Sequence, residues 1–502
     1  MADSRSDRTS ALTLTRARTR DPGSVDGSRL VDIVLHGDRV ADVRPAAAAP
    51  SEGERIDLDG RPVVPGLWDH HVHLDMWALR ESRLDLARAR SAAECARLVA
   101  LRLTDRPVRG GGTLVGTGFR DGVWPDLPTT RDLLDSHSGA TPVVLVSHDI
   151  HCAWLNSAAV HLWRPASHSD GLVRENDFYE LMTRVNDLPV EQIDAAVAES
   201  VRRAHGRGVV GVVEFERRPN LDTWQRRVRA GLRLRVACGV YAEHLDDAIE
   251  RGLATGTVLP ETRGLVEMGS LKVLLDGSLN TRTAWCYHPF PGVEPEAAYG
   301  MRVVEPDALR DLVARAHAAG IASALHAIGD RANTLALDTF EATGASGSIE
   351  HAQLIAREDL VRFAPLGVAA SVQPRHAIDD RAVADRHWSG RTDRAFLLAS
   401  LLGAGARLLL GSDAPVAPLD PWVTIASAVA RTGDERPPWH GEERLTLDQA
   451  LSASTRHPHL SRGVPADLVV LDADPWDASA DVLSAMPVAS TMIAGEFISL
   501  PE

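Results

Sequence analysis

The sequence predicts a (β/α)8 barrel, a ring of parallel strands in which each strand is followed by a helix. Eight short apolar runs recur through the middle of the 502-residue chain, and each one ends in polar residues. Helical spacers lie between them: residues 306–319 have helical periodicity, stop at Gly320 and lead into an apolar run that ends at His326. The predicted strands are residues 63–73, 209–214, 232–241, 271–276, 321–326, 348–351, 367–373 and 407–413.

Both ends of the chain predict a small β domain. The strand-like segments are 11–17, 31–43, with a hairpin turn at His36-Gly37-Asp38, and 466–472 and 488–497. Because chain termini often lie close together, we expect these segments to form one sandwich. A capping box of Thr446 with Gln449 predicts a helix at 446–454. The predicted domains are a small β-sandwich at 1–62 and 440–502, and a barrel at 63–439 with an inserted subdomain at about 75–207.

Composition excludes several classes of function. The formal net charge of −15, from 54 basic and 69 acidic residues, argues against a nucleic acid or an anionic membrane as the main partner. No stretch approaches the roughly 18 apolar residues of a membrane-spanning helix, and residues 1–21 lack the apolar core of a signal peptide. The four cysteines include no CxxC pair, which predicts a reducing compartment and no cysteine-rich zinc site. We therefore expect a cytoplasmic protein.

Polar residues at the predicted strand ends form a candidate metal site. His71 and His73 point the same way in an extended strand, so both imidazoles can reach one ion. With 20 histidines in the chain, chance alone gives such a pair about once, and the pair by itself cannot establish a site. His326, His351 and Asp413 also follow apolar strands, where a barrel exposes its catalytic side chains. Together these five residues predict a metal centre.

Lys272 is the only lysine among the 54 basic residues, and it lies on the fourth predicted strand. A bare ammonium beside metal ions would be costly to bury. A neutral amine, however, can take up CO2 to form a carbamate that bridges two cations, and arginine cannot, because its guanidinium stays protonated. The alternative is a buried structural lysine.

The motifs around these residues match a known family. The chain resembles the amidohydrolase superfamily of metal-dependent hydrolases, and within it the YtcJ-like (amidohydrolase-3) branch that includes N-substituted formamide deformylase. The matching motifs are PGLWDHHVHL at 65–74, KVLLDGS at 272–278, RTA at 282–284, HAIGDRA at 326–332, IEHAQ at 349–353, SVQP at 371–374, GSDAPV at 411–416 and ADLVVLDADP at 466–475. The segments 116–126, 128–135 and 147–159 look like the inserted region of the branch.

The resemblance implies a set of metal ligands and a mechanism. His71 and His73 would bind one ion with Asp413, His326 and His351 would bind a second, and a carboxylated Lys272 would bridge them. A metal-activated hydroxide would be the nucleophile, with Asp413 as general base. We expect two divalent ions in each subunit, with zinc preferred on ligand type. A single-metal site of His71, His73, His326 and Asp413 remains an alternative.

The same resemblance suggests substrate contacts and a reaction. The candidate substrate-binding residues are Arg120, His151, Trp154, Asn156 and Arg282. The expected activity is hydrolysis of a C–N bond in an amide, formamide or cyclic amide. Ester, lactone or C–Cl hydrolysis, metal-assisted decarboxylation or isomerisation, and a non-catalytic binding relative stay open as alternatives. The expected partner is a small-molecule substrate, with neither nucleic acid nor membrane, and a homodimer is left open.

Overall fold

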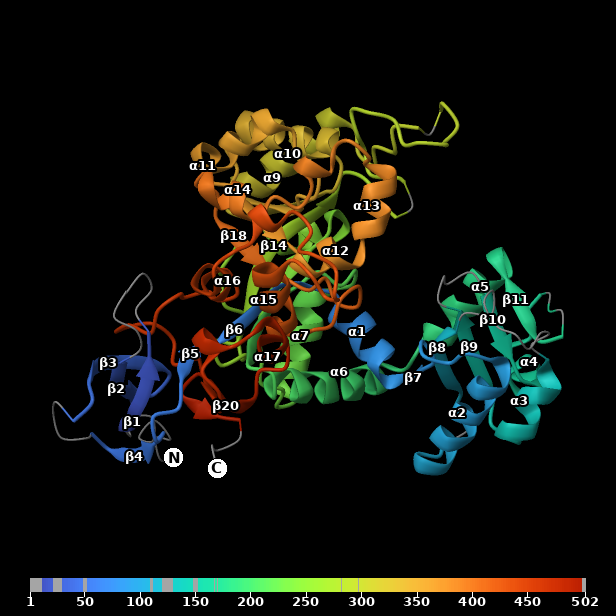
Figure 1. Cartoon of the computed structure of the whole chain (residues 1–502), viewed down its shortest axis with the longest axis horizontal. Coiled ribbons are helices and arrows are strands. Elements are labelled where there is room, and N and C mark those ends of the chain that lie inside the picture. The colour runs from blue at the N-terminus through green and yellow to red at the C-terminus, as the bar shows by residue number, and fades with distance from the viewer. Residues whose placement is uncertain are drawn as a thin grey trace. The chain divides into compact units, whose positions relative to one another are not determined.

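The computed structural model of the protein describes residues 11–20, 29–47, 52–108, 112–119, 130–147, 152–166, 168, 170–280, 282–296 and 298–498 (Figure 1). The chain divides into two compact units. The larger unit comprises Met1–Leu74 and Val201–Glu502, and the smaller one comprises Asp75–Ser200.

The larger unit contains the predicted barrel. Its strands are β6 (Leu67–Val72), β12 (Val209–Glu214), β13 (Arg235–Val240), β14 (Val266–Leu274), β15 (Ser323–Ala327), β16 (Gly347–His351), β17 (Ala369–Val372) and β18 (Leu408–Leu410). They form one parallel sheet in the order β18-β17-β16-β15-β14-β13-β12-β6. The sheet closes beyond β18, where Asp413 N donates to His71 O and His73 N donates to Ala414 O, both at 2.8 Å. The predicted fold class is confirmed.

Helices lie between the barrel strands, as the helical segments between the apolar runs predict. Those of the barrel are α7 (Asn220–Arg229), α8 (Leu245–Glu250), α9 (Pro306–Ala318), α10 (Asp330–Thr343), α11 (Phe363–Leu366), α12 (Pro374–Asp379), α13 (Arg381–His387), α14 (Leu398–Gly403), α15 (Pro421–Ala430), α16 (Leu447–Ala453) and α17 (Ala480–Ser484). Helix α9 begins with Pro306, whose missing N–H is not needed at a helix start. It ends before Gly320, which has a left-handed φ of 74° and turns the chain into the next strand.

The predicted first strand at 63–73 is two strands in the structure. Val63–Pro65 (β5) pairs antiparallel with β19 (Leu468–Leu471) in the sandwich, whereas β6 pairs with β12 in the barrel. Gly66 lies between them, and a Cβ at this position would approach the Val210 side chain to 2.5 Å. The sandwich therefore extends past the predicted boundary at residue 62, because one continuous apolar run serves two sheets.

The second domain boundary also differs. The predicted helix at 446–454 is α16, and its capping box is present: Thr446 N donates to Gln449 Oε1 at 2.8 Å, and Gln449 N donates to Thr446 Oγ1 at 3.2 Å. This helix packs against β18. Directly after it, Ser454 O accepts a hydrogen bond from Trp68 N at 2.7 Å. The barrel thus continues beyond the predicted limit at residue 439.

Two four-stranded sheets form the small β domain, in the orders β3-β2-β1-β4 and β21-β20-β19-β5. Their remaining strands are β1 (Ala11–Thr19), β2 (Arg29–His36), β3 (Arg39–Pro45), β4 (Glu54–Asp57), β20 (Val488–Ile493) and β21 (Glu496–Phe497). Leu14 and Ile33 from one sheet share a buried cluster with Leu468 and Met492 from the other. The segments from both ends of the chain thus share one core, as the sequence predicts.

The smaller unit is built on a five-stranded sheet in the order β11-β10-β9-β8-β7. Its strands are β7 (Leu84–Asp85), β8 (Leu114–Phe119), β9 (Val143–Ser147), β10 (Cys152–Leu155) and β11 (Leu172–Arg174). Its helices are α1 (Leu74–Ser82), α2 (Ala92–Asp105), α3 (Arg131–Ser138), α4 (Ser157–Trp163), α5 (Glu175–Asn186) and α6 (Val190–His205). The last residues of α6 belong to the larger unit. Alternate residues of β10 enter two hydrophobic clusters, Trp154 in one and Leu155 in the other. Both faces of the sheet are therefore covered. The unit lies in the region where the sequence predicts an insertion.

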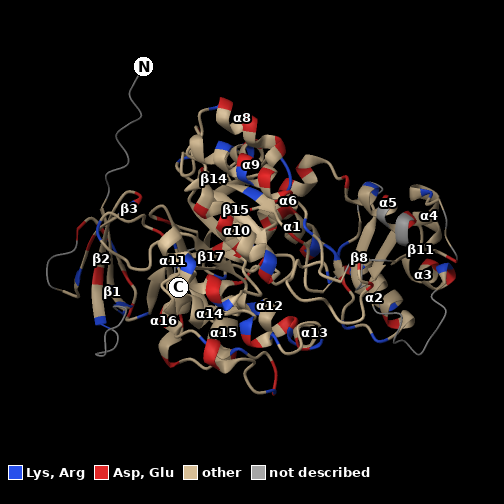
Figure 2. Ribbon diagram, turned by 90° about the horizontal axis from the view of Figure 1, so that it is seen from above, with Lys and Arg blue, Asp and Glu red and all other residues tan. Residues whose placement is uncertain are grey.

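Charged residues lie mainly on the helices and loops, and basic and acidic side chains are interspersed (Figure 2). Among the described residues, no helix combines the length and the apolar character needed to cross a bilayer.

Candidate metal centre

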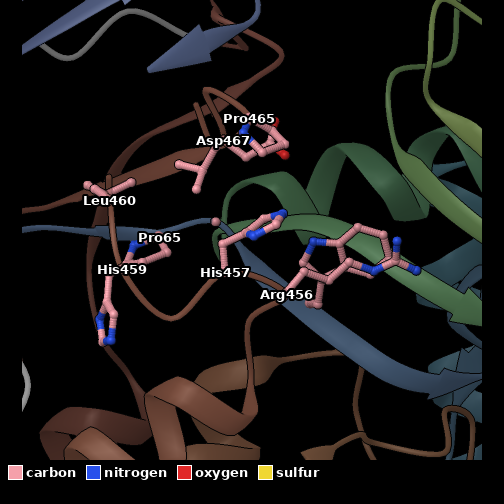
Figure 3. Close-up of a pocket in the computed structure, with 10 residues that line it drawn as sticks. Pro65, Arg456, His457, His459, Leu460, Pro465 and Asp467 are labelled. Carbon is pink, nitrogen blue, oxygen red and sulfur yellow. The ribbon is translucent and has the colours of Figure 1, made fainter. Parts of the chain in front are cut away.

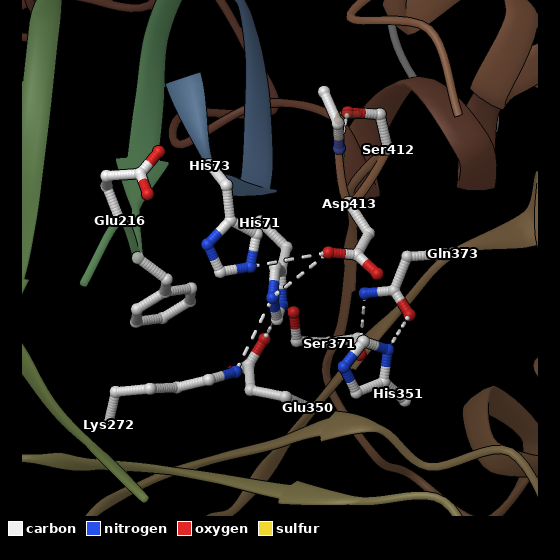
Figure 4. A network of polar contacts seen from close by, with 12 residues as sticks. His71, His73, Glu216, Lys272, Glu350, His351, Ser371, Gln373, Ser412 and Asp413 are labelled. Carbon is white, nitrogen blue, oxygen red and sulfur yellow. Dashed lines mark hydrogen bonds and ion pairs between the residues drawn. The ribbon is translucent and has the colours of Figure 1, made fainter. Parts of the chain in front are cut away.

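Residues from the first and last barrel strands meet at the carboxyl end of the barrel (Figure 4). His71 lies at the end of β6, His73 directly follows it, and Asp413 follows β18. One ligand atom of each residue lies within 4.8 Å of the other two. Nε2 of each histidine is 3.6 Å from Asp413 Oδ1. These are the three residues that the sequence assigns to one ion.

The backbone of this group is fixed by the closure of the barrel. Asp413 has a φ of 56°, a left-handed conformation that non-glycine residues rarely adopt, and its N–H donates to His71 O at 2.8 Å. Asp69 Oδ1 accepts hydrogen bonds from His71 N at 3.1 Å and from Ser412 N at 2.9 Å. Burial raises the pKa of Asp69 to about 6, and the bonds from Ser412 and His71 oppose this rise. The buried carboxylate ties the first strand to the last.

Three histidines have one ring nitrogen bonded to a protein acceptor. The bonds are His71 Nδ1 to Glu350 Oε2 at 2.6 Å, His351 Nδ1 to Gln373 Oε1 at 2.8 Å and His326 Nε2 to Gly277 O at 3.2 Å. The Gln373 amide nitrogen donates to Ser371 O at 3.4 Å, which leaves Oε1 as the acceptor for His351. A neutral imidazole that donates from one nitrogen keeps a lone pair on the other. Each ring therefore presents the lone pair that a metal ligand needs.

Burial keeps these imidazoles neutral. It lowers the pKa of His73 to about 4 and that of His326 to about 3, and the nearby Lys272 adds to both shifts. Burial also lowers the pKa values of His71 and His351 well below the ordinary value. Because only the neutral ring binds a metal, the protein interior holds these side chains in the form that coordination requires.

Lys272 joins the same centre from β14. Its side chain is buried, with Nζ 3.4 Å from His71 Nε2 and 4.4 Å from the centre of the Phe215 ring. Burial lowers the pKa of the Lys272 amine, an effect that Glu350 and Asp413 oppose. Burial raises the pKa of Asp413, and Lys272 opposes that rise. Burial thus makes the uncharged amine, the form that takes up CO2, more accessible than it is in an exposed lysine.

His326 and His351 lie side by side, with ring centres 4.5 Å apart. Asp276 lies beside His326, with Oδ1 3.5 Å from His326 Nε2, and this oxygen accepts a hydrogen bond from Ile328 N at 3.0 Å. Burial raises the pKa of Asp276 to about 7, and hydrogen bonds from the backbone oppose this rise. The six predicted ligands therefore gather at one end of the barrel. The second compact ligand group of the described residues, however, contains His351, His376 and Asp413 rather than the predicted pair of His326 and His351.

Sequence reasoning missed three residues of this site: Glu350, Gln373 and His376. Glu350 and His351 are neighbours on β16, and strand alternation would direct only one of them into the barrel. Both contribute because His351 has a φ of 74°, outside the extended region. Gln373 is the third residue of the SVQP motif and ends the predicted strand at 367–373, and His376 follows that motif by two residues, so position after an apolar strand is the signal that the sequence offers for both.

The predicted substrate-binding residues are only partly described. Arg120 and His151 lie outside the described residues. Arg282 belongs to the larger unit and is exposed, in the segment after β14, with a φ of 57°.

Trp154 and Asn156 lie in the smaller unit, and both are fully buried. Trp154 packs in a hydrophobic cluster, and its Nε1 donates to Thr130 O at 3.2 Å. Asn156 caps α4, because its Oδ1 accepts a hydrogen bond from Ala159 N at 2.9 Å. Both side chains are used inside this unit, and their positions do not support the predicted contact with a substrate.

A small cavity lies at the opposite end of β6 from the histidines (Figure 3). Pro65, Trp68, Arg456 and Asp467 contribute to its lining, and the Arg456 guanidinium lies 3.9 Å from the centre of the Trp68 ring. Its volume of about 10 Å³ leaves room for about one water molecule. The cavity is therefore too small for a substrate.

The donor set fits a divalent metal ion. Neutral imidazoles and a carboxylate converge, and the outer nitrogens of three rings are held by protein acceptors, as is typical of metal-binding histidines.

Comparison with known proteins agrees with this geometry. A family model described as "Amidohydrolase family" matches residues 54–499. The chain is 28% identical to the protein LONG AFTER FAR-RED 3 of Arabidopsis thaliana, covering 88% of this chain and 83% of the relative. It is 27% identical to the amidohydrolase YtcJ of Bacillus subtilis, over 89% and 90% of the two chains. It is 25% identical to the N-substituted formamide deformylase of Arthrobacter pascens, over 92% and 94%.

A solved structure gives the same result. An uncharacterized metal-dependent hydrolase from Pyrococcus horikoshii superposes with a TM-score of 0.80 at 26% identity, covering 94% of this chain and 99% of that one. The family model spans most of the sequence, including all six predicted ligands. The barrel, the buried histidines at its carboxyl end and these relatives together show that the chain belongs to the amidohydrolase family of hydrolytic enzymes, which act on carbon–nitrogen bonds.

Proposed function

We propose that the protein is a metal-dependent hydrolase that cleaves a C–N bond in a small-molecule amide, formamide or cyclic amide. The observation that carries this proposal is the convergence of His71, His73 and Asp413, with the outer nitrogen of His71 held by Glu350 at 2.6 Å. This arrangement supports one tightly held divalent ion. The relative that is named a formamide deformylase supports the bond type, and the Pyrococcus relative supports the need for a metal.

The bound ion would lower the pKa of a water molecule to near neutrality, and it would polarise the carbonyl group of the substrate. Zinc suits the imidazole and carboxylate ligands. We further propose that Lys272 is carboxylated and that, together with His326 and His351, it would hold a second ion. The lowered pKa of the Lys272 amine and its position 3.4 Å from His71 Nε2 support this part of the proposal.

Asp413 is proposed as the proton carrier. It accepts a proton from water as the water oxygen forms a bond to the carbonyl carbon, and it returns the proton to the nitrogen as the C–N bond breaks. One water is consumed, and a carboxylic acid and an amine are formed. The side chains of His73 and Asp413 are 23% and 12% exposed, whereas His71 is 1% exposed. We therefore expect the substrate to approach from the His73 side.

Metal analysis combined with a substrate panel tests this function. The purified protein is analysed for transition metals, stripped with a chelator and reloaded with zinc or manganese. It is then assayed on N-formyl, N-acyl, cyclic amide and ester compounds. We expect at least one equivalent of metal, and hydrolysis of an amide-type compound that disappears on chelation and returns on reloading.

A pair of histidine variants provides the control. His73→Ala removes a proposed ligand, whereas His459→Ala removes an exposed histidine beside the cavity at the other end of β6. We expect the first variant to lose metal and turnover and the second to keep both. Less than about half an equivalent of metal in the wild-type protein, with no gain on adding zinc or manganese, would contradict the proposal.

A further inference from the structure

We infer that the small β domain carries a second binding site, which takes a small phosphate monoester with an apolar body. The site is a cavity of about 300 Å³, and it is separate from the metal centre. Pro65 contributes to its lining and comes just before β6, whose opposite end carries His71. The inference therefore does not depend on the proposed hydrolysis.

The walls of this cavity come from both ends of the chain. The lining is formed by the end of β1, the start of β2, parts of β3 and β5, and residues 458–462 of the loop before β19. Backbone hydrogen bonds fix this loop on β3, because Gly463 N donates to Val40 O at 2.8 Å and Val40 N donates to Val464 O at 3.0 Å. Arg39 Nη1 also donates to Gly463 O, at 2.6 Å. The two walls are thus held together by the fold itself.

The cavity has an excess of positive charge. Three arginines contribute to its lining, Arg20, Arg29 and Arg462. Asp42 is the one acidic residue of the described lining, and its Oδ1 already accepts a hydrogen bond from Val43 N at 3.0 Å. The chain as a whole has a formal net charge of −15, so this excess is a local feature. It predicts an anionic ligand.

Two of these guanidinium groups lack a protein acceptor. Neither Arg20 nor Arg462 forms a hydrogen bond or an ion pair with a described residue, and Nε of Arg20 is buried. Arg462 is exposed, so its long side chain can turn toward an anion without breaking another contact. The planar fork of a guanidinium matches two oxygens of a phosphate. A phosphate monoester, with a charge of about −1.5 to −2 and three terminal oxygens, can use more than one such fork.

Part of the lining is apolar. Val63 belongs to the buried core of the sandwich, and Val43 and Leu460 pack against that core. Leu460 and Pro65 also line the smaller cavity of Figure 3. A volume of about 300 Å³ is at the lower end of the range of small-molecule sites. The apolar and basic parts together suit a ligand that joins an anionic group to a small apolar body.

Phenyl phosphate is the probe that tests this inference, because it joins a phosphate to one aromatic ring. It is titrated calorimetrically into the zinc-loaded protein, and inorganic phosphate, phenol and phenylacetate are titrated in parallel. A metal centre can also bind phosphate, so the same titrations are made with His73→Ala and with chelator-stripped wild-type protein. We expect phenyl phosphate to bind both of these, about tenfold more tightly than inorganic phosphate or phenylacetate, and phenol to give no measurable binding.

Charge variants locate the binding. Arg462→Glu reverses a charge at an exposed position of the cavity, and Arg20→Met removes the guanidinium of Arg20 but keeps a long side chain. Arg88→Glu is the matched control, because Arg88 is an exposed arginine of the smaller unit and does not line the cavity. We expect at least about tenfold weaker binding of phenyl phosphate in Arg462→Glu, about three- to tenfold weaker binding in Arg20→Met, and no change in Arg88→Glu.

Thermal unfolding gives a second readout. The cavity needs both ends of the chain in place, so a ligand that binds it binds only the folded protein and raises the melting temperature. Phenyl phosphate should therefore raise the melting temperature of the stripped wild-type protein, and it should raise that of Arg462→Glu much less at the same concentration.

Three results would overturn the inference. Wild-type affinity for phenyl phosphate in Arg462→Glu would place the binding elsewhere. Binding that disappears in both His73→Ala and the stripped protein would assign the phosphate to the metal centre, and phenylacetate that binds as tightly as phenyl phosphate would refute the ligand class. Should Arg20→Met fail to fold, Arg462→Glu still gives the comparison. A wild-type protein that holds no metal would refute the proposed function but would leave this test unchanged.

Discussion

Replacing Glu350 with Gln tests whether the proposed metal centre depends on the residue that orients His71. The Glu350 and His71 side chains are each 1% exposed, and their hydrogen bond of 2.6 Å joins a carboxylate to an N–H. A hydrogen bond to a charged group contributes about 1.5–3 kcal/mol, and one between neutral groups about 0.5–1.5 kcal/mol. Glu350→Gln keeps the shape of the side chain and removes its charge, so the hydrogen bond to the His71 ring should weaken by about 1–2 kcal/mol. If the whole of this loss appears in the free energy of zinc binding, zinc affinity should fall by roughly 5- to 30-fold.

Competition with a chromogenic chelator measures the zinc dissociation constant directly and needs no substrate. Glu443→Gln is the control, because Glu443 is also buried but its carboxylate accepts hydrogen bonds from Ser400. We expect the control to bind zinc like the wild-type protein. A folded Glu350→Gln protein whose zinc affinity lies within about twofold of the wild-type value would refute the reasoning, since the bond would then be irrelevant to the ion.

Further expectations concern the other residues of the centre and one structural residue. Lys272→Arg should lose one of two bound metal ions in elemental analysis, because a guanidinium cannot be carboxylated, and a variant with two ions and normal turnover would disprove the carbamate. Asp413→Asn should lower turnover by at least about 10²-fold while circular dichroism shows an intact fold, and retained activity would remove Asp413 as the proton carrier. Asn156→Ala should lower the free energy of unfolding by about 2 kcal/mol in denaturant titrations and leave KM unchanged, whereas a raised KM would restore Asn156 as a substrate contact. Burial lowers the pKa values of His73 and His376 to about 4 without metal, below the ordinary value of 6.5, so the unfolded chain binds more protons between these pH values. The free energy of unfolding of the stripped protein should therefore fall as pH drops from 6.5 to 4, by about 1.2 kcal/mol per pH unit for each histidine near pH 5, and denaturant midpoints independent of pH would contradict this.

The barrel could be predicted because its signals are local. Apolar runs that end in polar residues, and a helix that stops at Gly320, depend only on neighbouring residues. The division at Gly66 could not be foreseen, since the run from Val63 to Val72 is continuous in sequence and is split only by two competing partner strands.

The candidate site shows the same limit. His71, His73 and Asp413 follow from position at strand ends, but Glu350 and His351 share one strand and both enter the centre through a left-handed turn. No pattern of alternation contains that turn. The resemblance makes Trp154 a candidate substrate contact, yet the cluster that encloses it belongs to the core of the smaller unit.

The hydrogen bond from Asp413 N to His71 O has a consequence for how the protein is made. It joins a residue near the start of the barrel to one near its end, so the proposed ligands of a single ion are synthesised far apart in time. A nascent chain that stops before β18 has its histidines but lacks the carboxylate that completes the group. Tight binding of the ion would then begin only after β18 and Asp413 have been synthesised and have joined the barrel. An incomplete chain would stay without metal and inactive.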